Sequence, residues 1–277
     1  MTYGVIVGER GDPARWRDER RVLRRGPGTP YRKLQTLRHL VTRDRAAVRR
    51  FLTASYRVSR AERLRMLRAF VTITNAVRGY HTLSEILVAV DRILSRAGPG
   101  LTVVEAGAGS GASTAKLSLA VRAAGGRLHV FDTFRGIPAN DERHRLLDGT
   151  PIRFVKGAFR GRLGAVRRRV AAHGAPEVCT FHKGLFEDTL RRFDGAVDVA
   201  LLDVDLVAST RTCLKTLWPR LRPGGVLLSQ DGHLRATHEL LADDAFFRDD
   251  LGTAPPRVRA VCGDKLLELC PQYFEED

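Results

Sequence analysis

Apolar residues in the first third of the chain recur every three or four positions, the spacing of one face of a helix. Between residues 31 and 96 they fall into three such groups, which predict about three helices. The Ala-Gly-Pro-Gly run at 97–100 ends them, because glycine and proline break helices. Residues 1–30 are rich in Arg, Gly and Pro without this spacing and are predicted to be a poorly ordered arm.

From residue 101 the pattern changes to short apolar runs that alternate with helical segments. Strands are predicted at 101–106, 127–131, 177–182, 197–202 and 226–229, helices at 113–124, 163–173, 209–217 and 237–247, and a closing antiparallel pair at 257–261 and 265–269. Residues 135–160 are polar and resemble an insertion. This alternation predicts an α/β, Rossmann-like fold: a mostly parallel seven-stranded sheet with helices on both faces. We divide the chain into 1–98, an arm with a helical extension or lid, and 99–277, which carries the sheet.

Composition narrows the class of protein without identifying it. The chain has 277 residues, 43% of them apolar, and it has no apolar run long enough to span a membrane. The N-terminus lacks the layout of a secretion signal, so a cytoplasmic protein is expected. The cysteines show neither a CxxC pair nor zinc spacing, and we interpret them as reduced thiols: Cys179, Cys213, Cys262 and Cys270.

The net charge of +16 is concentrated at the N-terminus. Residues 1–68 hold 19 Lys and Arg against 6 Asp and Glu, whereas the remaining residues hold 28 against 25. A basic segment of this kind binds nucleic acid, an acidic carrier or an anionic substrate, or is simply a solvated helical face.

A glycine-rich turn follows the first predicted strand. Residues 103–111 read Val-Val-Glu-Ala-Gly-Ala-Gly-Ser-Gly, with Glu105 at the carboxyl end of the strand. Gly107 and Gly109 permit a tight turn, and the next helix, which includes Ser113, presents free N–H groups at its start. Dinucleotide and S-adenosylmethionine (SAM) sites both use such turns. SAM is favoured because Glu105 can face its ammonium group, and because the glycine spacing is GxGxG instead of the GxGxxG that a dinucleotide site prefers.

Two further strand ends complete the expected cofactor site. Asp132 ends the second strand, 27 residues after Glu105, where a carboxylate can accept both ribose hydroxyls; Thr133 follows it. After the third strand, Gly184 would leave room for the adenine, and Leu185 or Phe186 would cover it.

Acidic residues follow the fourth and fifth strands. Asp203 and Asp205 come after residues 197–202, and Asp231 and His233 come after residues 226–229. Because the ends of these strands are neighbours in such a sheet, Asp203 and Asp231 are expected to converge. Carboxylates suit Mg²⁺, which would bind two substrate oxygens and lower the pKa of the one to be methylated. Asp205 is either a third ligand or a helix cap, and His233 is an alternative general base to Asp203.

These motifs occur together in one family. The chain resembles the TylF-like (macrocin O-methyltransferase) family of SAM-dependent enzymes at residues 80–87, 103–120, 128–138, 181–190 and 201–234, within a span of roughly 80–270. The last segment carries the specific pattern DxDLxxST…LWPRLxPGG. The resemblance implies a class I methyltransferase fold, SAM, often Mg²⁺, and methylation of sugar or phenolic hydroxyls, with Asp203 and Asp231 serving metal and catalysis.

One position departs from the family. Several metal-dependent relatives carry two adjacent acidic residues after the fifth strand, and the first of these is Gln230 here. The site loses a charge, which strengthens the hypothesis that His233 acts as a metal-free base. Family members often self-associate through N-terminal helices, so a homodimer is one expectation.

Three functions are weighed. The first is a small-molecule O-methyltransferase whose lid and substrate wall are residues 31–96 and 135–160, with four candidate lining residues, Tyr80, His81, Glu85 and Phe134. The second is a nucleic-acid methyltransferase that uses the basic N-terminus. Against it, the fourth strand continues as LLDVDL instead of an Asn/Asp-Pro-Pro-Tyr motif. The third is a SAM-binding protein with other chemistry or none.

Overall fold

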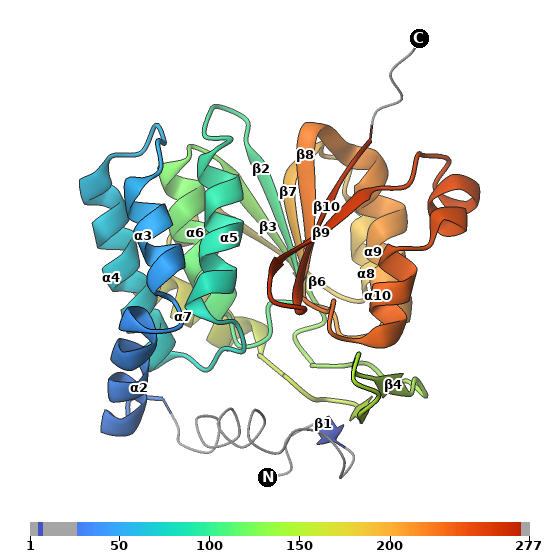
Figure 1. The fold of residues 1–277 in the computed structure, drawn as a ribbon, viewed down its shortest axis with the longest axis horizontal. Helices are drawn as coiled ribbons and strands as arrows, with labels where there is room; N and C mark the ends of the chain where they lie inside the picture. Colours follow the sequence, from blue (N-terminus) through green and yellow to red (C-terminus); the bar gives the residue numbers. More distant parts are fainter. Residues whose placement is uncertain (1–4, 8–26, 273–277) are drawn as a thin grey trace.

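The computed structural model describes residues 5–7 and 27–272. Its centre is a seven-stranded sheet in the order β6-β3-β2-β7-β8-β10-β9 (Figure 1). The strands are β2 (Thr102–Ala106), β3 (Arg127–Asp132), β6 (Cys179–Lys183), β7 (Val197–Leu202), β8 (Leu221–Ser229), β9 (Arg257–Cys262) and β10 (Leu266–Cys270). The first five are parallel, and β10 runs antiparallel between β8 and β9. The predicted fold class and the closing antiparallel pair are therefore confirmed.

Helices cover both faces of this sheet (Figure 1). One side carries α5 (Leu83–Leu94), α6 (Ala112–Ala123) and α7 (Leu163–His173), with α3 (Arg45–Thr53) and α4 (Arg60–Ala76) packed outside them. The other side carries α8 (Phe186–Thr189), α9 (Val207–Leu217) and α10 (Arg235–Leu241). Short 3₁₀ turns lie at Pro176–Val178, Leu190–Arg192 and Trp218–Arg220, and a π-helical turn lies at Phe246–Asp250.

Alternate strand residues feed two separate apolar cores. In β2, Val103 belongs to the core beneath α4 to α7, and Val104 belongs to the core beneath α8 to α10. The same alternation holds in β7 for Leu201 and Leu202, because successive strand side chains point to opposite faces. Helix α4 contributes Phe70 to the first core, so the N-terminal helices pack on the sheet domain directly.

The N-terminal region differs from expectation in two respects. Residues 30–94 form four helices instead of about three, because α2 (Pro30–Val41) and α3 are separated by a turn that ends at Asp44. Asp44 accepts hydrogen bonds from the backbone N–H and hydroxyl of Ser84, which ties this turn to the start of α5. The helical spacing of the apolar residues correctly predicts a helix here. It does not show whether the apolar face is buried, and Leu37 of α2 is 55% exposed.

The prediction of a poorly ordered arm over 1–30 is wrong where the structure describes that range. Val5–Val7 forms β1, which pairs antiparallel with β5 (Pro151–Phe154), and β5 pairs with β4 (His144–Arg145). Residues 27–30 lead into α2, where the Thr29 side chain caps the helix. Pairing with a distant strand leaves no periodic signal in so short a segment. The rest of the arm lies outside the described residues.

The four cysteines are free thiols, as predicted, and Cys213 is buried. Among the described residues, no helix is long and apolar enough to cross a membrane.

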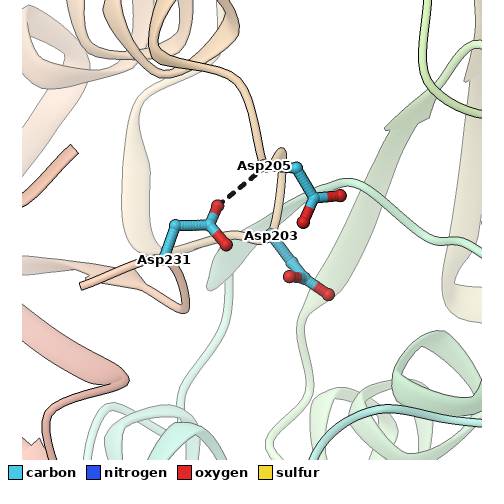
Figure 2. A group of neighbouring side chains, drawn as sticks. All are labelled: Asp203, Asp205 and Asp231. Atoms are coloured by element: carbon cyan, nitrogen blue, oxygen red, sulfur yellow. Dashed lines mark hydrogen bonds between the residues drawn. The ribbon is translucent and has the colours of Figure 1, made fainter. Parts of the chain in front are cut away.

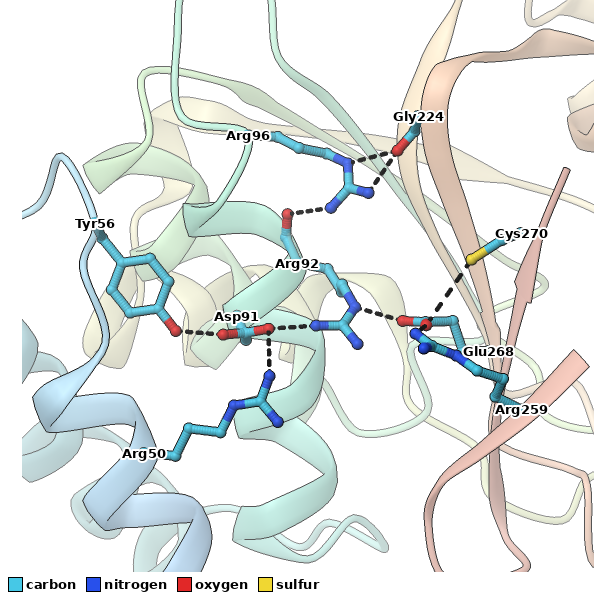
Figure 3. Close-up of polar contacts among 9 residues, drawn as sticks. All are labelled: Arg50, Tyr56, Asp91, Arg92, Arg96, Gly224, Arg259, Glu268 and Cys270. Carbon is cyan, nitrogen blue, oxygen red and sulfur yellow. Dashed lines mark hydrogen bonds and ion pairs between the residues drawn. The ribbon is translucent and has the colours of Figure 1, made fainter. Parts of the chain in front are cut away.

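A polar network joins the helical layer to the sheet edge (Figure 3). Glu268 of β10 is 1% exposed and accepts hydrogen bonds from Arg92 of α5 and Arg259 of β9. Burial alone would raise the pKa of Glu268, but these guanidinium groups bring it below its usual value. Asp91 extends the network to Tyr56.

Replacing Glu268 with glutamine is expected to destabilise the protein by about 1–3 kcal/mol, because two charge-assisted hydrogen bonds are lost. Since the folded-state pKa of Glu268 is lowered, its stabilising contribution is present above the unfolded pKa and is lost as the pH falls. Urea unfolding at pH 7 and pH 4 measures both effects. Asp250→Asn is the control: Asp250 also contacts two cations, Arg211 and Lys215, but at the exposed surface, so its loss should change stability far less. Equal effects of the two variants would contradict this account.

Candidate functional site

The glycine turn joins β2 to α6 at the carboxyl edge of the sheet. Gly107, Gly109 and Gly111 all adopt positive φ. A Cβ atom on Gly107 would lie 1.9 Å from the carbonyl oxygen of Asp203, so the turn presses against the backbone that follows β7. Only glycine fits at this position, and the first and fourth strand ends are thereby held together.

Glu105 is a buried carboxylate beneath this turn. Its exposed fraction is 0%, and neither oxygen has a hydrogen-bond partner among the described residues. Burial raises the pKa of Glu105 to about 7, against the opposing effect of the Ser113 and Thr114 hydroxyls. A buried acceptor without a donor is costly unless a ligand supplies one. This arrangement fits the ammonium group of SAM.

Asp132 ends β3 and fastens the same turn. One carboxylate oxygen accepts the N–H groups of Ala108 at 2.8 Å and Gly109 at 3.0 Å, and the other accepts the N–H of Phe134 at 2.5 Å. Thr133 uses its hydroxyl within the next turn, donating to the carbonyl of Gly136 at 2.9 Å. Asp132 therefore orders the glycine turn in this structure. To bind the ribose hydroxyls as well, the carboxylate oxygens of Asp132 would have to accept hydrogen bonds from the ribose and from these N–H groups at the same time.

The edge expected to border adenine is built from β6 and α8. The N–H of Gly184 donates to the carbonyl of Asp132 at 3.1 Å. Phe186 is buried in the core beneath α8 to α10, whereas Leu185 is 45% exposed. Of the two residues expected to cover a ring here, the structure leaves Leu185 available.

Three aspartates meet at the ends of β7 and β8. Figure 2 shows Asp203, Asp205 and Asp231 side by side, and one carboxylate oxygen from each lies within 4.8 Å of the others. Asp231 accepts the N–H groups of Val204 at 3.0 Å and Asp205 at 2.9 Å. These bonds hold Asp205 at a φ of +61°, an unfavourable conformation for a non-glycine residue. The predicted convergence of Asp203 and Asp231 is present.

Crowding of these carboxylates favours their protonated forms. Burial raises the pKa of Asp203 to about 6, with a smaller contribution from the charges of Glu85 and Asp132. Burial and repulsion by Asp203 raise the pKa of Asp231 to about 7, and burial and repulsion by Asp231 and Asp203 raise the pKa of Asp205 well above its usual value. Lys265, in the turn between β9 and β10, opposes all three shifts. A bound cation would relieve the same repulsion, so the cluster has the charge and geometry of a divalent-ion site.

Asp231→Asn is expected to make the chelator-treated protein less sensitive to pH. A carboxyl whose folded-state pKa is raised stabilises the fold below its unfolded pKa, near 4, and loses that contribution as the pH rises through about 7. The free energy of unfolding of the variant should therefore rise relative to wild type between pH 4 and pH 7. Urea titrations in EDTA measure it, and a constant difference across this range would contradict the assigned shift.

The loop between α4 and α5 and the insertion lie against the cluster and the turn. His81 is 7% exposed, and its Nε2 is 3.5 Å from Oδ2 of Asp203. Burial lowers the pKa of His81 to about 3. The rings of Tyr80 and Phe159 pack edge to face at 4.9 Å. Gly161 touches the glycine turn so closely that a Cβ atom there would lie 1.6 Å from the Gly109 carbonyl oxygen.

The remaining lining candidates have structural contacts. Glu85 completes a capping box with Thr82 at the start of α5. Phe134 is buried and packs edge to face with Phe181.

Glu142, in the insertion, caps α9. Its two oxygens accept the N–H groups of Val207 at 2.9 Å and Ala208 at 3.0 Å. The alternative that Asp205 caps this helix is therefore wrong: α9 begins after Leu206 without a side-chain cap of its own. Sequence reasoning missed Glu142 because its partner helix lies more than 60 residues away.

His233 and Gln230 flank Asp231. The backbone carbonyl of His233 accepts the N–H of Leu147 at 3.1 Å, which docks the insertion. The imidazole of His233 is not part of the group of three carboxylates. Gln230 is fully buried, and both polar atoms of its amide lack hydrogen-bond partners among the described residues.

A sheet with this strand order and a glycine turn after its first parallel strand defines the class I methyltransferase fold. Residues 104–232 match a protein family described as a methyltransferase domain. A Streptomyces olivaceus protein is 28% identical over 195 residues, which cover 68% of this chain and 73% of that protein. It is named 8-demethyl-8-(2,3-dimethoxy-alpha-L-rhamnosyl)-tetracenomycin-C 4'-O-methyltransferase.

Solved structures agree with this classification. The O-methyltransferase NovP superposes with a TM-score of 0.56 at 18% identity, covering 83% of this chain and 98% of NovP. CalS11, a calicheamicin methyltransferase, superposes with a TM-score of 0.55 at 18% identity, covering 95% of this chain and 97% of CalS11. At these identities the shared feature is the fold. The match over residues 104–232 shows that the chain contains a methyltransferase domain, and the superpositions show that its fold is the one used by SAM-dependent methyltransferases.

Proposed function

We propose that this protein transfers the methyl group of SAM to a hydroxyl of a sugar, either free as a nucleotide sugar or attached to a natural product. The observation that carries the proposal is the position of Asp203. Its backbone contacts the glycine turn, and its side chain belongs to the carboxylate cluster. Hydroxyl-activating groups therefore adjoin the expected donor site.

The donor site is assigned to the residues around the turn. Glu105 would bind the ammonium group, the backbone from Gly107 to Gly109 would receive the donor closely, and Asp132 would orient both turn and ribose. Ser113, Thr133, Gly184 and Phe186 are kept as cofactor-site residues, with the side chain of Phe186 packed in the core behind the expected adenine position. SAM supplies an electrophilic methyl group.

Asp203, Asp205 and Asp231 would hold a divalent ion, Mg²⁺ in the first instance. A divalent ion here acts as a Lewis acid that lowers the pKa of the acceptor hydroxyl. Asp203 would accept the hydroxyl proton, because its carboxylate lies in the cluster while its backbone contacts the glycine turn. His233 remains the second hypothesis for the base, and a comparison of His233→Gln with wild type in EDTA tests it. The convergence of Asp203 and Asp231, which the TylF-like resemblance assigns to metal and catalysis, supports a place in that family.

The acceptor class follows from the relatives. The S. olivaceus protein is named for 4'-O-methylation of a rhamnosyl tetracenomycin, CalS11 is named a calicheamicin methyltransferase, and NovP is named an O-methyltransferase. The segment from Glu142 to Gly161, which contacts α9 at one end and the glycine turn at the other, would form the acceptor wall.

The decisive experiment is incubation with SAM and one of three acceptors: a nucleotide-linked rhamnose, a rhamnosylated polyketide or bulk RNA. S-adenosylhomocysteine formation is measured with Mg²⁺ and with EDTA. Turnover of either sugar acceptor alone supports the proposal. Turnover of RNA alone would replace it with nucleic-acid methylation, and SAM binding without turnover of any acceptor would count against it.

A further inference from the structure

The carboxylate cluster has a neighbour that is not an acid. His81 lies in the loop before α5, far from the cluster in sequence, and its side chain is 7% exposed. Its Nε2 atom is buried and has no hydrogen-bond partner among the described residues. A buried imidazole nitrogen in this state is unfavourable unless a ligand uses it.

The distance from His81 to Asp203 fits shared coordination better than a hydrogen bond. Nε2 lies 3.5 Å from Oδ2 of Asp203, beyond the usual N–H···O range. Two atoms bonded to one ion at about 2.0–2.2 Å, with about 90–110° between the bonds, lie about 2.8–3.6 Å apart. The observed separation falls within that interval.

The loop that carries His81 is fixed on both sides. Thr82 and Glu85 form the capping box of α5, and Ser84 is bonded to Asp44. On the other side, the ammonium group of Lys265 donates to the carbonyl of Tyr80 at 3.4 Å. The imidazole is thus held at the cluster by the fold before any ion binds, a condition for a well-defined ligand.

We propose that His81 is the nitrogen ligand of the ion held by Asp203, Asp205 and Asp231, and that the site prefers a transition metal such as Mn²⁺ or Co²⁺ over Mg²⁺. This inference rests on the metal site of the proposed function. Imidazole suits transition metals, whereas carboxylate-only sites suit Mg²⁺. His81 would supply a fourth ligand beside the three carboxylates.

The test compares metals on the full chain after EDTA treatment. Calorimetry measures Mn²⁺, Co²⁺ and Mg²⁺ affinity, and pulsed electron paramagnetic resonance of the Mn²⁺-loaded protein detects nitrogen bonded to the ion. Wild type should bind Co²⁺ at least about tenfold more tightly than Mg²⁺ and show nitrogen coupling. His81→Gln should lose the coupling and most of that preference. His39→Gln, on the wall of the small cavity that His81 also lines, should retain both.

A second variant distinguishes the loss of a metal ligand from a folding defect. His81→Asp replaces the nitrogen with oxygen and should shift the preference toward Mg²⁺, in the opposite direction to simple damage. If Mn²⁺ binds without nitrogen coupling and His81→Gln behaves as wild type, the role of His81 is overturned while the aspartate site stands. If wild type binds none of these ions, the metal site is overturned as a whole. The proposed methyl transfer would still stand if the protein binds SAM and turns over its acceptor in EDTA.

Discussion

Replacing Gly107 with alanine is expected to weaken SAM binding by about 100-fold or more. The new Cβ atom would lie 1.9 Å from the Asp203 carbonyl oxygen, at a φ of +91° that alanine adopts only with strain. The backbone must therefore move, and the turn and the start of the β7 loop move with it. Calorimetry with SAM and with S-adenosylhomocysteine measures the loss, and a thermal melt reports the accompanying fall in stability.

Gly149→Ala is the control that separates the effect of backbone strain from that of a steric clash. Gly149 has a φ of +86°, close to that of Gly107, but a Cβ atom there meets nothing within 4 Å. It should cost about 1–2 kcal/mol of stability and leave SAM affinity unchanged. Wild-type affinity in Gly107→Ala would show that the turn does not form the donor site.

Asp203→Asn is expected to lower the rate of methyl transfer by about 10²–10⁴-fold, the usual effect of removing a general base. The amide cannot accept the hydroxyl proton and coordinates an ion weakly, while the backbone contact with the glycine turn remains. SAM affinity should therefore stay within about threefold of wild type. Steady-state assays at saturating SAM, together with calorimetry, separate the two quantities.

Asp194→Asn is the matched control, because Asp194 is an exposed aspartate just before β7. It should leave rate and affinity unchanged. An Asp203→Asn enzyme with near-normal turnover would transfer the role of base to another group, of which His233 is the first to test.

Much of the sheet follows from the sequence, because its strands are continuous apolar runs with clear ends. The predicted bounds of β7 and α7 match the structure residue for residue. Two boundaries were wrong for local reasons. The strand predicted to begin at residue 226 begins at Leu221 instead, because residues 221–225 continue β8 alongside β7 across a register irregularity. The helix predicted to reach residue 247 ends at Leu241, because Asp243 accepts the N–H groups of Ala245 and Phe246 and starts a new turn.

Some residues of the candidate site could likewise be predicted from the sequence, and others could not. Glu105, Asp132, Asp203 and Asp231 could be placed from sequence, since each lies at or just after the carboxyl end of a strand and parallel strand ends share one edge. The approach of His81 to Asp203 could not be, because its loop reaches the cluster through the packing of α4 and α5 on the sheet. Lys265 gave no signal either, since only the closing hairpin brings it near the aspartates. The orientation of Phe186 could not be predicted either: it lies at the expected place, but its side chain packs in the core.

The cap that Glu142 places on α9 bears on any effort to retarget this enzyme to a new acceptor. If an insertion taken from another enzyme had no acidic residue at this position, the N–H groups of Val207 and Ala208, which follow Asp205 in the chain, would lose their hydrogen-bond acceptor. The helix would then begin differently, and the carboxylates ahead of it would shift. The insertion that would choose the acceptor therefore also holds the carboxylate cluster in place. Exchanging the insertion without keeping an acidic residue at position 142 would change both the acceptor and the geometry of the cluster.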